Sequence, residues 1–191
     1  MKNDIILSGV GGQGILLIAS IIGLAAVECN LFLKQSEVHG MSQRGGDVQS
    51  HLRLSDRMIA SDLIPHGRAD IIISVEPMES LRYLPWLSET GWIVTNSNPF
   101  INIKDYPPID EILLEIRKVK NHIIIDADLI AKEIGSVKAV NMVILGAASP
   151  FIEIPCINLE KAIRSFFKRK GEEIAGMNLS AFRAGRDFTV K

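Results

Sequence analysis

Apolar residues fall into short runs along this chain, and stretches with helical spacing separate most of these runs. The runs are continuous and mostly rich in β-branched residues, and they predict β-strands at residues 5–7, 31–33, 70–75, 92–95 and 122–126. Helical spacing predicts helices at residues 13–28, 78–87, 109–119 and 127–134, and one more from Leu159 to Phe167 with Asn158 as its N-cap. We therefore expect an α/β fold of the Rossmann-like, three-layer αβα type around a mostly parallel sheet.

One segment departs from this order. Residues 48–54 alternate between apolar and polar side chains in their second half, as a strand does. The connection that precedes them is rich in glycine and has no helical pattern, whereas parallel neighbours need a long crossover. We therefore expect this strand to run antiparallel to its neighbours, which would make the sheet mixed.

Composition bounds the size and the partners of the molecule. The chain has 191 residues, of which 47% are hydrophobic, and no repeat or linker divides it. Residues 1–191 are therefore expected to form a single domain with a real core. Lys and Arg number 21 against 22 Asp and Glu, so the net charge of -1 provides no general field for nucleic acid or anionic lipid.

The apolar run at residues 15–27 is interrupted by Ser20 and Gly23 and is shorter than the ~20 residues that a bilayer helix needs. No charged, apolar and small-residue sequence typical of a secretion signal stands at the amino terminus, so we expect a cytoplasmic chain. Cys29 and Cys156 are isolated, and they cannot provide the four ligands of an iron–sulfur cluster or of a common structural zinc site. Any metal chemistry would then come from a partner.

Two acidic residues after the predicted strand at residues 122–126 allow two interpretations. Asp126 and Asp128 together could suggest a pair of ligands for a hard metal ion. Asp126, however, stands directly before a predicted helix, which is the position of an N-cap. We favour capping over a metal site.

The first chemical motif follows the first strand and opens the first helix. It satisfies G-x-G-x-x-G through Gly9, Gly11 and Gly14, and Gly12 and Gln13 between them are further candidates for contacts to a cofactor or substrate. Such a turn brings backbone N–H groups and the positive end of a helix to a phosphate, although a tight strand-to-helix turn also needs glycines for packing alone. An NAD site needs an acid about 20 residues further on. Lys34 stands there, and the nearest acid is Glu37.

A second polar loop follows at residues 37–46. Its candidates for contacts to a substrate or cofactor are Ser42, Gln43, Arg44, Gly45 and Gly46, and His39 and Arg44 are the candidate catalytic residues. The guanidinium of Arg44 beside two glycine N–H groups could receive a carboxylate or a phosphate, and His39 could transfer a proton. The alternative is a structural bend in which Arg44 satisfies backbone carbonyls.

Several motifs together resemble one family. Gly-x-Gly-Gly-Gln-Gly after the first strand is followed some 25 positions later by His39-Gly40-Met41-Ser42-Gln43-Arg44-Gly45-Gly46. Further matches are Ala69-Asp70-Ile71-Ile72-Ile73, Asn141-Met142-Val143-Ile144-Leu145-Gly146 and Asn178-Leu179-Ser180-Ala181-Phe182-Arg183-Ala184-Gly185. This set resembles the gamma-type catalytic domain of 2-oxoacid:ferredoxin oxidoreductases, which has the fold of domain III of pyruvate-ferredoxin oxidoreductase. The loop at residues 38–44, on a stand-alone chain of this length, is most similar to the small subunits that serve indolepyruvate.

The resemblance implies a share in the CoA-dependent oxidative decarboxylation of arylpyruvates to aryl-acetyl-CoA, with ferredoxin as electron acceptor. It places thiamine diphosphate, magnesium and the 4Fe-4S clusters in a large alpha subunit, and CoA is the co-substrate. The chain lacks the Gly-Asp-Gly followed by paired Asn that holds thiamine diphosphate with magnesium in related enzymes. We therefore expect it to bind no cofactor alone, to be inactive alone, and to contact CoA or substrate through its two loops.

Other functions remain open at this point. The chain could be the gamma subunit of an enzyme for another 2-oxoacid, such as pyruvate or 2-ketoisovalerate. It could also be a stand-alone NAD-binding oxidoreductase, or a scaffold that binds protein alone. An accessory subunit should expose an apolar face, and when isolated it could associate with itself.

Overall fold

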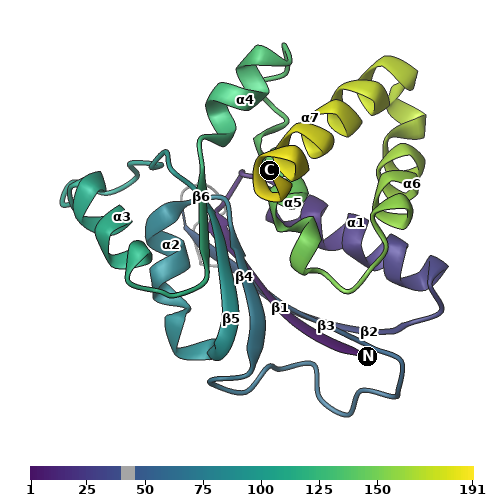
Figure 1. The fold of residues 1–191 in the computed structure, drawn as a ribbon, viewed down its shortest axis with the longest axis horizontal. Helices are drawn as coiled ribbons and strands as arrows, with labels where there is room; N and C mark the ends of the chain where they lie inside the picture. The colour runs from purple at the N-terminus through teal and green to yellow at the C-terminus, as the bar shows by residue number, and fades with distance from the viewer. Residues whose placement is uncertain (40–45) are drawn as a thin grey trace.

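Six strands form one sheet between two helical layers in the computed structural model, which describes residues 1–39 and 46–191 (Figure 1). The sheet has the order β2-β3-β1-β4-β5-β6. The strands are β1 (Lys2–Val10), β2 (Phe32–His39), β3 (Asp47–Ser55), β4 (Ala69–Ser74), β5 (Leu87–Asn96) and β6 (His122–Ile125). β1, β4, β5 and β6 are parallel neighbours, whereas β3 runs antiparallel to both β1 and β2. The predicted α/β class, the mostly parallel mixed sheet and the antiparallel strand are thereby confirmed.

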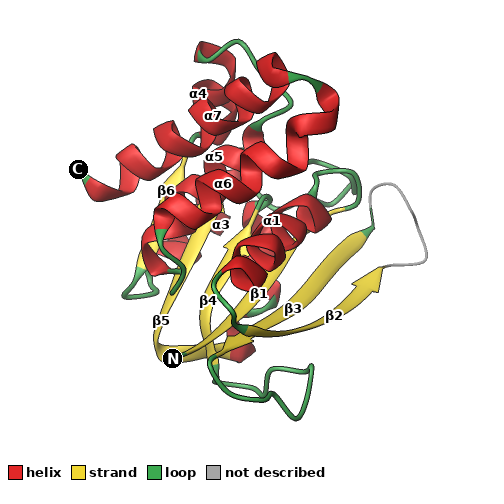
Figure 2. Cartoon of the chain, turned by 90° about the vertical axis from the view of Figure 1, so that its right-hand side faces the viewer, coloured by secondary structure: helices red, strands yellow, loops and turns green. Residues whose placement is uncertain are grey.

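Helices cover both faces of the sheet. One layer holds α1 (Ile15–Glu28), α4 (Ala127–Glu133), α5 (Val140–Ala148), α6 (Cys156–Phe167) and α7 (Glu172–Val190), and Figure 2 shows much of it in front of the strands. The other layer holds α2 (Pro77–Arg82) and α3 (Ile109–Arg117). Alternate strand residues feed the two cores, so Ile71 and Ile73 pack under the first layer and Ile72 packs under the second. Among the described residues, no helix is both long and apolar enough to cross a membrane.

Two predicted helices differ from the structure by more than two residues at one end. The helix predicted at residues 78–87 ends at Arg82, and a short 3₁₀ turn (Leu84–Trp86) leads directly into β5. Pro85 explains the break, because proline cannot donate the backbone hydrogen bond that a continuing helix needs. Asn158 is not an N-cap, since α6 already begins at Cys156 behind Pro155, whose fixed φ suits the start of a helix.

The backbones of α5 and α7 touch where the two helices cross. A Cβ atom at Gly146 would overlap the carbonyl oxygen of Phe182, and a Cβ atom at Gly185 would overlap that of Val143. Both overlaps involve backbone atoms, which cannot rotate away as a side chain can. The absence of a side chain at these two positions is therefore what allows the helices to pack at this distance.

We predict that Gly185→Ala lowers the free energy of unfolding by at least about 2 kcal/mol, because the added methyl group forces two packed helices apart. Gly176→Ala on the same helix is the matched control, since a Cβ atom there meets no atom within 4 Å. The control should be neutral or up to about 1 kcal/mol more stable, because alanine favours a helix over glycine. Urea unfolding of both variants measures the difference, and equal stability of the two would contradict the crossing geometry.

His51 on β3 is a buried histidine held in its neutral form. Its Nδ1 accepts the N–H of Ile64 at 3.0 Å, which ties the connection between β3 and β4 to the sheet. Burial, and then the nearby charge of Arg53, lower the pKa of His51 below its ordinary value of 6.5. Since the unfolded chain binds this proton more readily than the folded chain, the fold loses stability as the pH falls below about 6.5.

We predict that the free energy of unfolding falls between about pH 7.5 and about pH 5, and that His51→Asn reduces this fall. The Oδ1 of asparagine can accept the same N–H bond but does not titrate. Chemical denaturation at both pH values measures the two slopes. Identical slopes for the variant and the parent would show that His51 does not carry the pH dependence.

Candidate functional site

A cavity of about 500 Å³ opens at the carboxyl ends of the parallel strands. The chain leaves β1 toward the α1 layer and leaves β4 toward the α2 layer, so the crevice lies at a topological switch point. Ligands of open α/β sheets bind at such points. The residues that line the cavity are Gly12, Gln13, Val75, Asn96, Asn98, Pro99, Phe100, Asp128, Val137, Lys138, Val140 and Asn141.

The glycine motif forms the turn at one side of this cavity. Gln13 closes the turn on itself, because its Oε1 accepts the N–H of Val10 at 2.8 Å and its own N–H donates to the carbonyl of Val10 at 3.1 Å. Gly12 and Gly14 have φ of 103° and 80°, a left-handed conformation that favours glycine. Gly12 and Gln13 line the cavity, whereas Gly9 packs against Ile15.

The amino end of α1 completes this side. Gly14 is the N-cap and provides no side chain to satisfy the first turn, and its carbonyl accepts the N–H of Leu17 at 3.1 Å. The first N–H groups of a helix have no partner within the helix, and together they carry a partial positive charge. This end of the cavity therefore suits an anion such as a phosphate.

Asn141, in the first turn of α5, faces the glycine turn from across the cavity. Its Nδ2 donates to the carbonyl of Gly14 at 3.4 Å, and a Cβ atom at position 14 would overlap this amide. Its Oδ1 is buried and has no hydrogen-bond partner within the described part of the chain. A buried acceptor without a partner is costly, so the wall of the cavity contains one polar atom whose hydrogen bonding is unsatisfied among the described residues.

Polar groups after β5 and β6 form the remaining wall. Asn96 donates to Asp128 at 2.7 Å and accepts the N–H of Ala127, and Asn98 donates to Asp126 at 2.7 Å and to Asp128 at 3.2 Å. Asp126 also accepts the N–H of Leu129 at 2.9 Å, which confirms the predicted N-cap. Within residues 1–39 and 46–191, no three His, Cys, Asp or Glu side chains are placed to hold a metal ion.

A backbone hydrogen bond joins the end of the polar loop to the glycine turn. The N–H of Gly11 donates to the carbonyl of Gly46 at 2.8 Å, so the end of the polar loop lies beside the glycine turn. Ser42, Gln43, Arg44 and Gly45 lie outside the described residues, as does the side chain of His39. Their predicted contacts stay predictions.

A cluster of charged side chains lies at the same edge, toward the α2 layer. The hydroxyl of Tyr83 donates to both carboxylate oxygens of Asp47 at 2.9 and 2.8 Å, and Arg82 donates to Glu79 at 2.8 Å. Burial raises the pKa of Glu79, although the bond from Arg82 acts in the opposite direction. This cluster fastens the first residue of β3 to the end of α2. The sequence does not predict it, because Asp47 and Tyr83 are 36 positions apart and belong to no common motif.

A buried carboxylate holds the loop at residues 97–108 next to the cavity. Glu76 is fully buried and accepts the N–H of Glu79 at 2.8 Å, the N–H of Phe100 at 3.3 Å and the hydroxyl of Tyr106. Burial raises the pKa of Tyr106, and the bond to Glu76 adds to this effect. The loop exposes Phe100, Ile101 and Ile103, so an apolar surface is fixed beside the cavity by a charged group.

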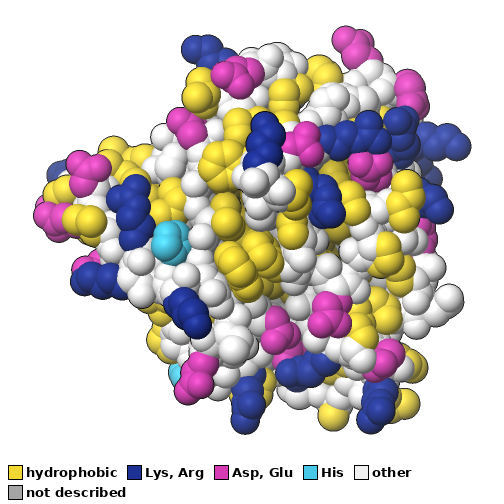
Figure 3. Space-filling view, viewed as in Figure 1, with side chains coloured by type: hydrophobic (Ala, Val, Ile, Leu, Met, Phe, Trp, Pro, Cys, Tyr) yellow, Lys and Arg dark blue, Asp and Glu magenta, His cyan; other side chains and the backbone are white. Residues whose placement is uncertain are grey.

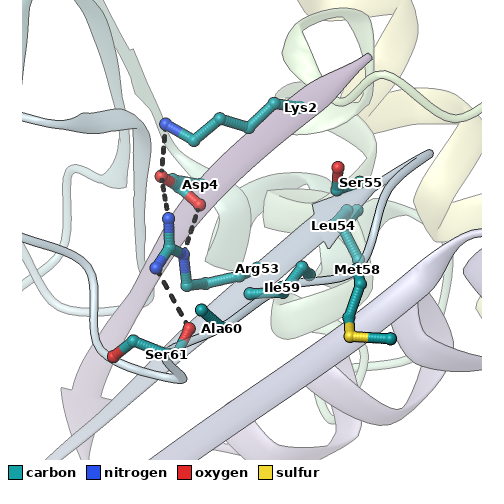
Figure 4. Close-up of a pocket in the computed structure, with 9 residues that line it drawn as sticks. All are labelled: Lys2, Asp4, Arg53, Leu54, Ser55, Met58, Ile59, Ala60 and Ser61. Carbon is teal, nitrogen blue, oxygen red and sulfur yellow. Dashed lines mark hydrogen bonds and ion pairs between the residues drawn. The ribbon is translucent and has the colours of Figure 1, made fainter.

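A second cavity, of about 280 Å³, lies at the other end of the strands, beside the start of β1 and the end of β3 (Figure 4). Asp4 is buried there between Lys2 at 2.7 Å and Arg53 at 2.8 Å. Arg53 also donates to the carbonyl of Ser61 at 3.0 Å, so its guanidinium holds the connection between β3 and β4. The protein itself uses the charged groups of this cavity, which favours a structural role.

The geometry of Glu37 differs from that of the acid in an NAD site. Glu37 lies in β2, and β3 stands between β2 and β1. In a Rossmann domain the acid follows the strand adjacent to the glycine turn, one strand spacing of about 4.8 Å away. Here two strand spacings separate Glu37 from β1, and its carboxylate accepts a bond from Gln35 at 2.8 Å.

The fold and the cavity define an α/β domain with a cavity at the switch point of its sheet, between a glycine turn and the start of α5. The family model for pyruvate ferredoxin/flavodoxin oxidoreductases matches residues 4–188, and the chain belongs to this family.

Several relatives match this chain along nearly its whole length. Indolepyruvate oxidoreductase subunit IorB of Archaeoglobus fulgidus is 38% identical over 199 residues, which cover 100% of this chain and 96% of the relative. The subunit of the same name from Methanothermobacter thermautotrophicus is 35% identical, covering 97% of this chain and 96% of the relative. 2-Oxoglutarate synthase subunit KorC of the latter organism is 26% identical, covering 100% and 97%.

Solved structures share the fold. The gamma subunit of keto/oxoacid ferredoxin oxidoreductase from Geobacter sulfurreducens superposes with a TM-score of 0.71 at 23% identity, covering 98% of both chains. A 2-oxoglutarate:ferredoxin oxidoreductase from Magnetococcus marinus gives a TM-score of 0.78 at 24% identity. This match covers 99% of the present chain and 31% of that longer chain.

We predict that Tyr106→Phe speeds amide hydrogen exchange in residues 97–108 by roughly tenfold or more, because the loop loses a hydrogen bond to a buried charge. Tyr83→Phe is the matched control, since it removes a tyrosine–carboxylate bond from the Asp47 cluster and leaves the loop untouched. Hydrogen exchange followed by mass spectrometry measures both variants. An unchanged loop in Tyr106→Phe, or equal loosening in the control, would show that Glu76 does not hold this segment.

Proposed function

We propose that this chain is the small, beta subunit of an indolepyruvate ferredoxin oxidoreductase. It supports the CoA-dependent oxidative decarboxylation of arylpyruvates to aryl-acetyl-CoA, with ferredoxin as the electron acceptor. Residues 1–191 serve as a single gamma-type domain that acts in the cytoplasm, and the chain is inactive without its large alpha subunit.

The observation that carries this proposal is the similarity to four archaeal subunits named for indolepyruvate. They are 33–38% identical to this chain over at least 95% of its length. Subunits named for 2-oxoglutarate are 25–28% identical, and one named for pyruvate and ketoisovalerate is 26% identical. The difference favours an arylpyruvate over these other 2-oxoacids.

The cofactors of the reaction belong, in this proposal, to the large subunit. Thiamine diphosphate with magnesium supplies the decarboxylation chemistry there, and 4Fe-4S clusters carry the electrons to ferredoxin. Two isolated cysteines support this division, because clusters of this kind need four thiolates. The tasks of this chain are then to bind and to orient CoA or the substrate. The partially positive amino end of α1 and the polar wall opposite it suit these tasks.

The cavity at the switch point supports contacts to CoA. The phosphates of CoA suit the positive end of α1, with the ammonium of Lys138 nearby. Asn96, Asn98 and Asn141 line the cavity with amide groups, which suit the amide and amino groups of CoA. Ser42, Gln43, Arg44, Gly45 and Gly46 would extend this contact toward the substrate. His39 and Arg44 are the candidate catalytic residues: His39 would transfer a proton, and the guanidinium of Arg44 would hold a carboxylate or a phosphate.

We predict that Lys138→Glu, in the complex with the large subunit, raises the KM for CoA by about tenfold, because a carboxylate then replaces a cation near the phosphates. The KM for indolepyruvate should stay the same, since the keto acid reacts at the cofactor of the other subunit. Anaerobic assays of indolepyruvate-dependent and CoA-dependent dye reduction measure both constants.

Lys161→Glu is the matched control, because Lys161 is exposed on α6, outside the residues that line the cavity. Equal KM values for CoA in both variants would contradict the assigned contact. The same assay tests the substrate class: faster turnover of pyruvate or 2-oxoglutarate than of indolepyruvate by the parent complex would overturn the arylpyruvate assignment.

A further inference from the structure

The outer side of β6 is an unpaired edge of the sheet. β6 is the last strand in the order, and it pairs with β5 on one side. The N–H of Ile93 donates to Asn121 at 3.0 Å and the N–H of Ser97 donates to Ile125 at 2.9 Å, so the odd-numbered residues of this segment bond toward β5. Alternate residues of a parallel strand bond to opposite sides, and the N–H and carbonyl groups of His122 and Ile124 therefore point away from the sheet.

Four apolar and four polar or charged residues line the surface along this edge. A groove of about 480 Å³ runs along it, with Leu113 of α3, Ile123 and Phe188 of α7 among its lining residues. Phe188 is 48% exposed. Seen from the direction of Figure 1, hydrophobic side chains gather in the middle of the face that carries β6 and the end of α7 (Figure 3). Among the described residues, no strand covers this side of β6.

The charges at the two ends of β6 are opposite in sign. Lys120 precedes the strand and Asp126 follows it, and both side chains are exposed. Each lies three residues from Ile123, one before it and one after it. When a second copy of the strand is turned by 180° about an axis through Ile123, Lys120 of each copy therefore lies opposite Asp126 of the other copy.

We propose that β6 pairs antiparallel with β6 of a second copy of this chain, which joins the two sheets into one. His122 then lies opposite Ile124 of the second copy, and Ile123 lies opposite Ile123 of the second copy. These are the residues whose free N–H and carbonyl groups point outward, so this register satisfies them on both copies. Lys120 lies opposite Asp126 of the second copy, twice by symmetry.

The register is specific because the alternatives lose contacts. After a shift by one residue, Ile123 and Ile125 lie opposite the outward-pointing groups of the second copy. The N–H and carbonyl groups of these two residues point toward β5 and cannot form those bonds. A shift by two residues leaves at most one residue of each copy with a bonded partner and separates the opposite charges. The strand is short, and exposed ion pairs contribute little affinity, so the dimer should be weak, with a dissociation constant of roughly micromolar size.

The contact also reaches the wall of the cavity. Asp126 accepts a bond from Asn98 at 2.7 Å, and Asn98 lines the cavity together with Asp128. A second copy at β6 would hold Asp126 from its outer side. The proposal is independent of the proposed function, because it concerns the isolated chain and needs neither CoA nor a 2-oxoacid.

Sedimentation velocity of the full chain over a concentration series tests the pairing. The parent should show a monomer–dimer equilibrium that shifts toward monomer at high salt. Lys120→Glu and Asp126→Lys should each weaken the dimer by at least about tenfold, since each places like charges opposite each other. The double variant with both changes should recover to within about threefold of the parent, because the pairs form again with the charges exchanged.

Two controls keep folding and location separate from pairing. Asp126→Asn retains an N-cap for α4 but removes the charge, and it should show an intermediate loss of about threefold. Lys161→Glu on α6 should dimerise as the parent does.

A parent that stays monomeric up to about 100 µM, or a double variant that does not recover, would overturn the proposal. A Lys120→Glu chain that loses the large subunit while the parent never self-associates would also overturn it and would assign the edge to that subunit. Neither result bears on turnover of the parent complex, which tests the proposed function separately.

Discussion

The contact between the backbones of α5 and α7 is the constraint on which the candidate site depends. Gly146 and Gly185 let the two helices touch, and this contact sets how closely α5 packs against α7. The start of α5 then reaches the glycine turn, where Asn141 packs against Gly14 in the space that a Cβ atom would fill. Three glycines that are far apart in the sequence therefore allow two close contacts of α5, one with α7 and one with the glycine turn. A methyl group at any of them moves a wall of the site as well as the core.

Most strands could be predicted because burial on both faces leaves a plain signal of consecutive β-branched residues. The antiparallel β3 could also be predicted, since the connection before it has no helix. The helix α5 was missed for the opposite reason: every residue from Val140 to Ala148 except Val140 is buried, so no polar face gives it an amphipathic period. β2 is longer than its apolar run, because hydrogen bonds to β3 extend it through the polar residues up to His39. Tertiary contacts, rather than local propensity, decide these boundaries.

The candidate site could be located from sequence at its glycine turn and not at its opposite wall. Gln13 and Gly14 stand in a motif whose spacing has a local geometric cause, and the cavity does lie beside them. Asn141 is 127 positions away from Gly14. It opens one of the segments that resemble the family, but nothing in that segment indicates that it faces the glycine turn. The same holds for Glu76, which would be read from sequence as the start of a turn. Its role depends on a loop that returns from a different strand to meet it.

Glu76 shows how the fold keeps an apolar loop in a fixed shape at its surface. A segment that exposes Phe100, Ile101 and Ile103 would be expected to collapse or to move, because nothing covers these side chains within the described chain. The buried carboxylate instead receives bonds from the backbone of the loop and from Tyr106, and bonds to a charged acceptor are about twice as strong as neutral ones. Folding therefore meets the entropic cost of ordering this surface before any partner arrives. If the large subunit of the proposed enzyme docks here, it gains the burial of these side chains without having to order the loop, and the cavity wall that Phe100 shares with Asn98 is in place at the same time.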